Sequence, residues 1–126
     1  MNFEDILDSA VKVAVYAAEE RTERAQINQL LEKLESETKS KGVIITIIHI
    51  LRQVEREKFG KKAANEIIKN LKEFLDQNPE TAKNNARELL GLVKWLYDGN
   101  RIVGLRSNQI RETGNFNTLL QEFLRR

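Results

Sequence analysis

Apolar residues recur at intervals of three and four positions along most of the chain, which is the spacing of amphipathic helices. The first series follows Asn2, whose side chain can cap a helix, and continues to Ala18. A second series covers residues 27–34. The polar residues 19–22 interrupt the pattern, so residues 3–37 form either one bent helix or two.

The middle of the chain combines a polar break with a strongly apolar run. Polar residues and Gly42 predict a loop at residues 38–42. The run 43–51 has strand character because it is apolar and β-branched on every side, but it continues without a turn signal into charged residues that end at Gly60. We therefore predict a helix, and its apolar circumference predicts a central, covered position. Its expected core-facing stripe is Ile44, Ile47, Ile48, Leu51 and Val54.

Two more helices are predicted on either side of the only proline. The helix before it covers residues 61–77. Asn78 then supplies a capping side chain and Pro79 suits the first position of the next helix, which should end at residue 97 or 98. The residues expected to face inward are Ala64, Ile67, Ile68, Leu71, Phe74 and Leu75 in the first helix and Ala82, Ala86, Leu89, Leu90, Val93 and Leu96 in the second.

Shorter segments follow. A helix stop at residues 98–100 precedes an extended stretch at 101–106, a short helix at 107–112 and a last amphipathic helix at 116–124. The predicted fold class is all-α. We expect one domain over residues 1–126, built as a compact bundle of five to seven helices with short connections.

The composition excludes several kinds of catalytic, disulfide and metal-binding site. The chain has 126 residues, no cysteine and one histidine, so disulfides, thiol nucleophiles, cysteine-based zinc sites and sites with two histidines are excluded. Glycines occur singly, so there is no phosphate-binding glycine loop. His49 lies in the isoleucine-rich run, where a core or partly buried histidine is expected rather than a general base. Trp95 is expected to pack at the edge of an apolar stripe. We therefore expect no enzyme, no cofactor and no metal.

The start of the chain and its hydropathy indicate where in the cell the protein is expected. The chain begins with an acidic segment rather than a basic and then apolar signal peptide, and no apolar run approaches the roughly 18 residues of a membrane span. The sequence therefore predicts a cytoplasmic protein with no membrane partner.

Charge is divided along the chain. Residues 1–38 are net acidic and residues 39–126 net basic, although the whole chain carries only +2. Basic residues bracket the junction near Gly60, and every basic residue after position 100 is an arginine, whose planar fork matches phosphate oxygens. Solvated Lys–Glu pairs on helix faces are the commoner explanation of any single cluster. The bracketing residues are Arg52, Arg56, Lys58, Lys61 and Lys62.

One short motif has a known counterpart. Residues 105–111, which read Leu-Arg-Ser-Asn-Gln-Ile-Arg, resemble the Leu-x-Thr/Ser-Asn/Ser-Gln-Ile-Arg signature of the small α-helical subunit of type III-A CRISPR effector complexes. The type III-B relatives share its small, helical, Lys/Glu-rich character. In that family the signature lies nearer the amino end and long helices follow it, whereas 15 residues follow Arg111 here. Either the helices of this chain are in a different order, or the match is a coincidence.

The resemblance implies a non-enzymatic RNA-binding subunit of an antiviral ribonucleoprotein. Its partners would be the backbones of guide RNA and target strand, other effector-complex subunits and copies of this chain. The motif positions carried over are Asn108, Gln109 and Arg111. With the basic residues, the candidate nucleic-acid-binding set is Arg52, Arg56, Lys61, Lys62, Arg101, Arg106, Asn108, Gln109 and Arg111.

Two other functions fit the same residues. In a sequence-specific DNA-binding regulator, residues 107–112 would be a short recognition element that presents Asn108, Gln109 and Arg111 to base edges. In a helical protein–protein adaptor, neither basic cluster would bind nucleic acid, and the apolar helix at residues 43–54 would complete the core of a partner.

Overall fold

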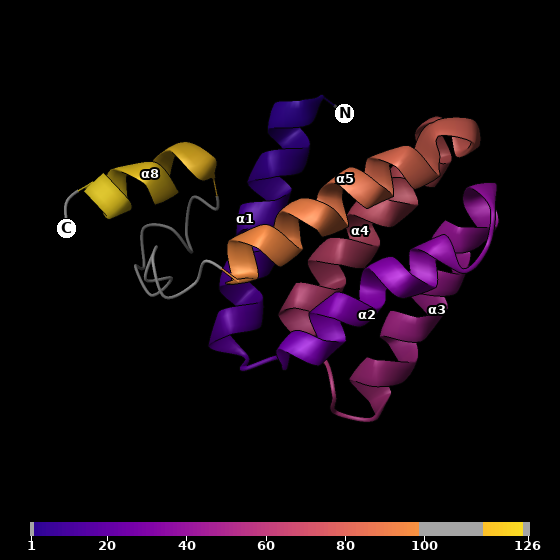
Figure 1. The fold of residues 1–126 in the computed structure, drawn as a ribbon, viewed down its shortest axis with the longest axis horizontal. Helices are drawn as coiled ribbons and strands as arrows, with labels where there is room; N and C mark the ends of the chain where they lie inside the picture. Colours follow the sequence, from indigo (N-terminus) through magenta and orange to yellow (C-terminus); the bar gives the residue numbers. More distant parts are fainter. Residues whose placement is uncertain (1, 99–114, 125–126) are drawn as a thin grey trace.

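The computed structural model describes residues 2–98 and 115–124, and these residues form six helices and no strand (Figure 1). The all-α class and the expected number of helices are therefore confirmed, as is the helical state of residues 43–51. The helices are α1 (Phe3–Glu19), α2 (Arg24–Glu35), α3 (Lys39–Glu55), α4 (Lys61–Gln77), α5 (Pro79–Asp98) and α8 (Phe116–Leu124).

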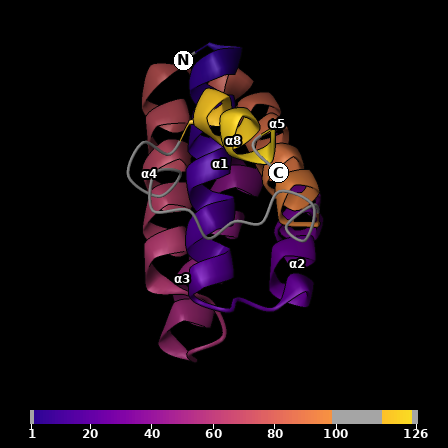
Figure 2. The same ribbon diagram turned by 90° about the vertical axis from the view of Figure 1, so that its left-hand side faces the viewer.

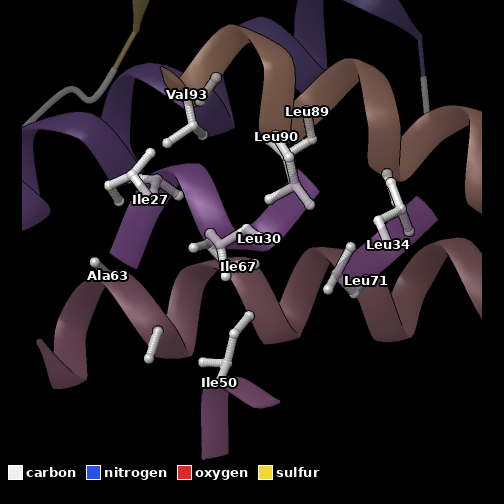
Figure 3. Packing of buried hydrophobic residues seen from close by; sticks show 14 of the residues in the cluster. Ile27, Leu30, Leu34, Ile50, Ala63, Ile67, Leu71, Leu89, Leu90 and Val93 are labelled. Atoms are coloured by element: carbon white, nitrogen blue, oxygen red, sulfur yellow. The ribbon is translucent and has the colours of Figure 1, made fainter. Parts of the chain in front are cut away.

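Helix α5 packs against four other helices, α1, α2, α3 and α4 (Figure 1). Small residues on α5, Ala82 and Ala86, are fully buried and let neighbouring helices approach closely. Figure 3 shows how side chains of four helices meet in one core cluster. The labelled residues are Ile27, Leu30 and Leu34 of α2, Ile50 of α3, Ala63, Ile67 and Leu71 of α4, and Leu89, Leu90 and Val93 of α5.

Residues 3–37 form two helices, which settles the alternative that the sequence left open. The chain turns at Arg21, whose backbone takes a left-handed conformation with φ 56°. Two hydrogen bonds of Thr22 join this turn to distant parts of the chain. Its Oγ1 accepts a hydrogen bond from the Gly60 amide at 3.1 Å, and its carbonyl accepts one from the Tyr97 hydroxyl of α5. Tertiary contacts therefore hold the break between α1 and α2 in place.

The loop expected at residues 38–42 is wrong, because α3 already begins at Lys39. Gly42 acts in close packing rather than as a helix breaker. A Cβ added there would lie 2.3 Å from the Leu34 carbonyl oxygen and 2.8 Å from that of Glu37. Lys83 of α5 holds the short connection, since its Nζ donates to the Glu37 carbonyl at 2.9 Å. The backbone of α2 thus passes directly over the start of α3.

The stripe predicted to bury α3 is wrong in part, and so is the central position of this helix. Ile44, Ile48 and Leu51 are 46%, 47% and 54% exposed. The side chains that α3 buries completely lie on its opposite side and include Val43 and Ile50. A helix with apolar residues on two sides can turn only one of them toward a bundle. The other members of the predicted stripe, Ile47 and Val54, are partly buried against the core.

The boundaries of α4 and α5 agree with the predictions. The Asn78 Oδ1 accepts a hydrogen bond from the Glu80 amide at 3.0 Å, and Pro79 is the first residue of α5. Gly60 was expected to end the preceding helix, but α3 ends at Glu55 and Gly60 is instead the N-cap residue of α4. The predicted inward residues of α4 and α5 are buried or partly buried.

The last described helix, α8, lies against α1 (Figure 2). Leu119 is buried among Val11, Ala14 and Val15 of α1. The Phe116 amide donates to the Asp8 carboxylate at 3.0 Å, which anchors the first turn of α8. The stretch predicted as extended at 101–106, and the short helix predicted at 107–112, lie outside the described residues.

Candidate nucleic-acid interface

A polar groove of about 480 Å³ lies between α2 and α3. The connection of these helices is short, so α3 packs directly against α2. Arg52 of α3 and Arg56, the C-cap residue of this helix, are four residues apart and therefore lie on one side of it, which also carries His49. The lining residues are Gln29, Glu32 and Lys33 of α2, Ile45, Ile48, His49, Arg52 and Gln53 of α3, and Arg56, which directly follows α3.

The groove gathers three cations: Lys33, Arg52 and Arg56. Within residues 2–98 and 115–124, none of the three takes part in an ion pair, whereas Arg87 of α5 lies 2.9 Å from the Glu35 carboxylate. Glu32 is the one acidic residue of the lining. The groove is therefore electropositive, and its arginines present guanidinium donors that match phosphate or carboxylate oxygens.

His49 is partly buried in this groove, where its surroundings disfavour the charged imidazole. Burial lowers the pKa of His49, and the neighbouring charges of Lys33 and Arg52 lower it further. Its Nε2 atom is buried and has no hydrogen-bond partner among the described residues. The partly buried position matches the expectation from the sequence.

The basic residues expected to bracket one junction do not form one cluster. Arg52 and Arg56 line the α2–α3 groove, whereas Lys58 and Lys61 line a second hollow, of about 440 Å³, beside the α1–α2 turn. Lys62 is turned toward α1, where its Nζ lies 6.0 Å from the centre of the Tyr16 ring. Arg52 and Arg56 thus line a different hollow from Lys58 and Lys61.

Acidic residues of the first two helices also have structural partners. The two carboxylate oxygens of Glu20 accept hydrogen bonds from the backbone amides of Lys62 and Ala63, at 2.9 and 3.0 Å. They therefore cap the positive end of α4 from a distant part of the chain. Glu35 pairs with Arg87 and lies 4.0 Å from Lys83. This part of the acidic segment stabilises the bundle itself.

The candidates near the carboxyl end lie outside the described residues. They are Arg101, Arg106, Asn108, Gln109 and Arg111. Their predicted contact with nucleic acid stays a prediction.

Sequence reasoning missed Lys33 as a site residue because Glu32 and Glu35 surround it in the sequence and suggest a solvated acidic surface. It also placed Trp95 wrongly, since that side chain is 76% exposed on α5. A signal for the groove was present in the spacing of Arg52 and Arg56. The face of α2 opposite them, however, follows only from the packing of the two helices.

Comparisons of the chain with protein-family models, with curated proteins and with solved structures find no match. In the part of the chain that the structure describes, no group of three histidine, aspartate or glutamate side chains could hold a metal ion. None of the described helices is long and apolar enough to cross a membrane.

Proposed function

We propose that the protein is a non-catalytic subunit that binds the sugar–phosphate backbone of RNA in the α2–α3 groove. The observation that carries the proposal is the convergence of Lys33, Arg52 and Arg56 from two helices on one open groove without ion-pair partners among the described residues. A cation left without an internal partner is available to a phosphate. Two arginines one helical turn apart can each form paired hydrogen bonds to phosphate oxygens.

The small net charge limits how tightly a single copy can bind RNA. With a net charge of only +2, one copy should bind RNA weakly and with a strong dependence on salt. Copies arranged along one strand would gain effective concentration, so several weak contacts would suffice. Contacts to phosphates alone do not read sequence, which suits a complex in which base pairing supplies specificity.

The motif at residues 105–111 extends the proposal. By its resemblance, the chain would be the small subunit of a type III CRISPR effector complex, with guide RNA and target strand as ligands. Arg106 and Arg111 would then add phosphate contacts to those of the groove. Neighbouring effector-complex subunits, including copies of this chain, would be its protein partners.

The test is the salt dependence of RNA binding. A fluorescent single-stranded RNA and a duplex DNA of equal length are titrated with the protein over a salt series. The Arg52→Ala/Arg56→Ala variant should bind RNA more weakly, and removing two phosphate contacts should lower the slope of log K against log salt by about 1.4. Lys69→Ala/Lys72→Ala, which removes the same charge from α4, serves as the control and should leave the slope nearly unchanged.

Other results would contradict the proposal. Equal effects of the two variants would mean that only total charge matters and that the groove is not the site. A preference for one duplex DNA sequence would favour the DNA-binding regulator. An Arg106→Ala/Arg111→Ala variant tests the motif separately, and unchanged RNA binding by this variant would remove those residues from the site.

A second function is favoured by one observation, the exposed stripe of Ile44, Ile48 and Leu51 on α3. Three large aliphatic side chains at neighbouring helical positions form a surface suited to a partner helix. A protein–protein adaptor would use this stripe and would not bind RNA or DNA even at low salt. Failure of both nucleic acids to bind in the titration above would therefore make the adaptor the better proposal.

A further inference from the structure

Trp95 is the only tryptophan of the chain, and it lies exposed on α5. With 76% of its surface accessible, the indole contributes little to the core. Large aromatic side chains usually bury most of their surface in a monomer and are enriched where a protein binds a partner. A flat, accessible indole is suited to stacking on a planar ligand.

The indole borders an apolar hollow of about 340 Å³ between α2 and α5. Gly91 forms part of its lining, four residues before Trp95, and nothing lies within 4 Å of the position that a Cβ would take there. The fold therefore does not require glycine at this place, although glycine is less favourable than alanine in a helix. Without a side chain at this position, the hollow stays open beside the indole. Leu31 of α2 and Leu92 of α5 complete its apolar part.

The hollow and the basic groove lie on two sides of the same helix. Leu31 of α2 lines the hollow, while Gln29 and Lys33 of α2 line the groove. A strand that crosses α2 can therefore place its backbone in the groove and a base in the hollow. Arg87, Glu88 and Lys94 also line the hollow. Arg87 is paired with Glu35, whereas Lys94 has no ion-pair partner among the described residues and is available to an adjoining phosphate.

We propose that Trp95 stacks on an unpaired base of a single-stranded RNA, which enters the hollow over Gly91. This inference rests on the proposed function, since the backbone of the same strand would lie in the α2–α3 groove. It narrows the ligand to single strands, because a base within a duplex is already stacked on both faces and cannot enter the hollow. It also predicts little sequence preference, since every base offers a flat face.

The intrinsic fluorescence of the protein tests this directly, because all tryptophan emission arises from Trp95. The full chain is titrated with a single-stranded oligouridylate and with a duplex RNA of equal length, while binding is followed separately by the anisotropy of a labelled strand. The single strand should quench Trp95 with the same midpoint as the anisotropy change. The duplex should leave the Trp95 emission unchanged, even where its phosphates contact the groove.

Variants separate stacking from backbone binding. Trp95→Ala should weaken binding of the single strand by about tenfold, and by the same factor at every salt concentration, because stacking releases no counterions. Trp95→Phe should retain most of the affinity. Gly91→Leu should fill the hollow, leave the helical circular dichroism unchanged and abolish the quenching. Phe3→Ala is the matched control, because it removes another exposed aromatic residue, 53% accessible, and should have no effect.

The titrations distinguish a failure of backbone binding in the groove from a failure of base stacking on Trp95. If the single strand binds with the salt dependence expected of the groove but Trp95 is not quenched, the groove stands and the stacking inference is wrong. If neither RNA binds at low salt, both are wrong, and the hollow is left for an apolar side chain of a protein partner. Equal quenching by duplex and single strand would also overturn the stacking inference.

Discussion

Helices α3 and α4 each span 17 residues, yet they use their apolar residues differently. All large apolar side chains of α4 face the core or its margin, with Ile67, Leu71 and Phe74 completely buried. In α3, Ile44, Ile48 and Leu51 remain about half exposed. Helix α4 thus carries the apolar side chains that the fold needs, whereas α3 carries more than the fold needs.

The two helices also differ at their ends. Glu20 caps the first turn of α4 with two hydrogen bonds, whereas the Thr38 side chain at the start of α3 makes no capping hydrogen bond. On α4, Lys72 pairs with Asp76 at 2.7 Å, while Arg52 of α3 has no ion-pair partner among the described residues. Arg52 and the exposed aliphatic side chains of α3 are not needed by the fold, and they are the groups proposed to bind RNA or a protein partner.

The largest effect expected from this difference concerns core truncation. Phe74→Ala in α4 should lower the free energy of unfolding by about 3–5 kcal/mol, because it leaves a cavity in a fully buried site. Ile48→Ala in α3 should change it by less than about 0.5 kcal/mol, because the side chain is 47% exposed. Urea denaturation of both variants measures the two values. Similar losses would mean that the α3 stripe belongs to the core.

The next largest effect concerns the start of α3. Gly42→Ala should destabilise the protein by about 1–3 kcal/mol, because the new methyl group would overlap the backbone carbonyls of Leu34 and Glu37. Gly91→Ala in α5 meets no neighbour and should stabilise the protein by about 0.5–1 kcal/mol through helix propensity. Thermal unfolding should move the two midpoints in opposite directions. A gain for both variants would exclude the tight contact between α2 and α3.

The cap of α4 gives a smaller effect. Glu20→Ala removes two charge-assisted hydrogen bonds to the first turn of α4 and should cost about 1–2 kcal/mol. Thr38→Ala at the start of α3 should cost less than about 0.5 kcal/mol, since no capping bond is lost. Chemical denaturation measures the free energy of unfolding of both variants. A larger loss of stability for Thr38→Ala would contradict the expectation that the start of α4 is the more strongly capped one.

The smallest expected effect is a pH dependence of the protein's stability near neutrality, which should arise from His49 of α3. The pKa of His49 is lowered by burial and by Lys33 and Arg52, so the unfolded chain binds a proton more readily than the folded one. Stability should therefore fall as the pH drops below the unfolded value of about 6.5, until His49 is protonated in both states. Denaturation at about pH 7.5 and about pH 5.5 measures this slope. His49→Gln should flatten it, and an unchanged slope would assign it to other groups.

Much of the fold could be predicted because its signals are local. The cap at Asn2, the Asn78-Pro79 start of α5 and the span of α4 depend on neighbours within one helical turn, and all three agree with the structure. The loop at residues 38–42 was wrong because the local signal of Gly42 is the same for a helix break and for a close backbone approach. The carbonyls that distinguish the two lie on α2.

The candidate site was less predictable. Arg52 and Arg56 were identified from their charge and spacing, and the structure brings them together with Lys33. Lys61 and Lys62, which the sequence grouped with them, lie at the start of α4 near other residues. Charge and helical spacing thus identify groups on one helix, but not which helices share a groove.

The sequence alone determined an all-α chain and most of its helix boundaries, because helical periodicity, caps and proline act over a few residues. Only the tertiary structure decided which side of α3 is buried, which acidic residues cap or pair within the bundle, and that Trp95 faces solvent. The physical reason is that a helix with two apolar sides has two nearly equivalent ways to pack. The fit of Val43 and Ile50 against the other helices selects one of them and leaves Ile44, Ile48 and Leu51 at the surface.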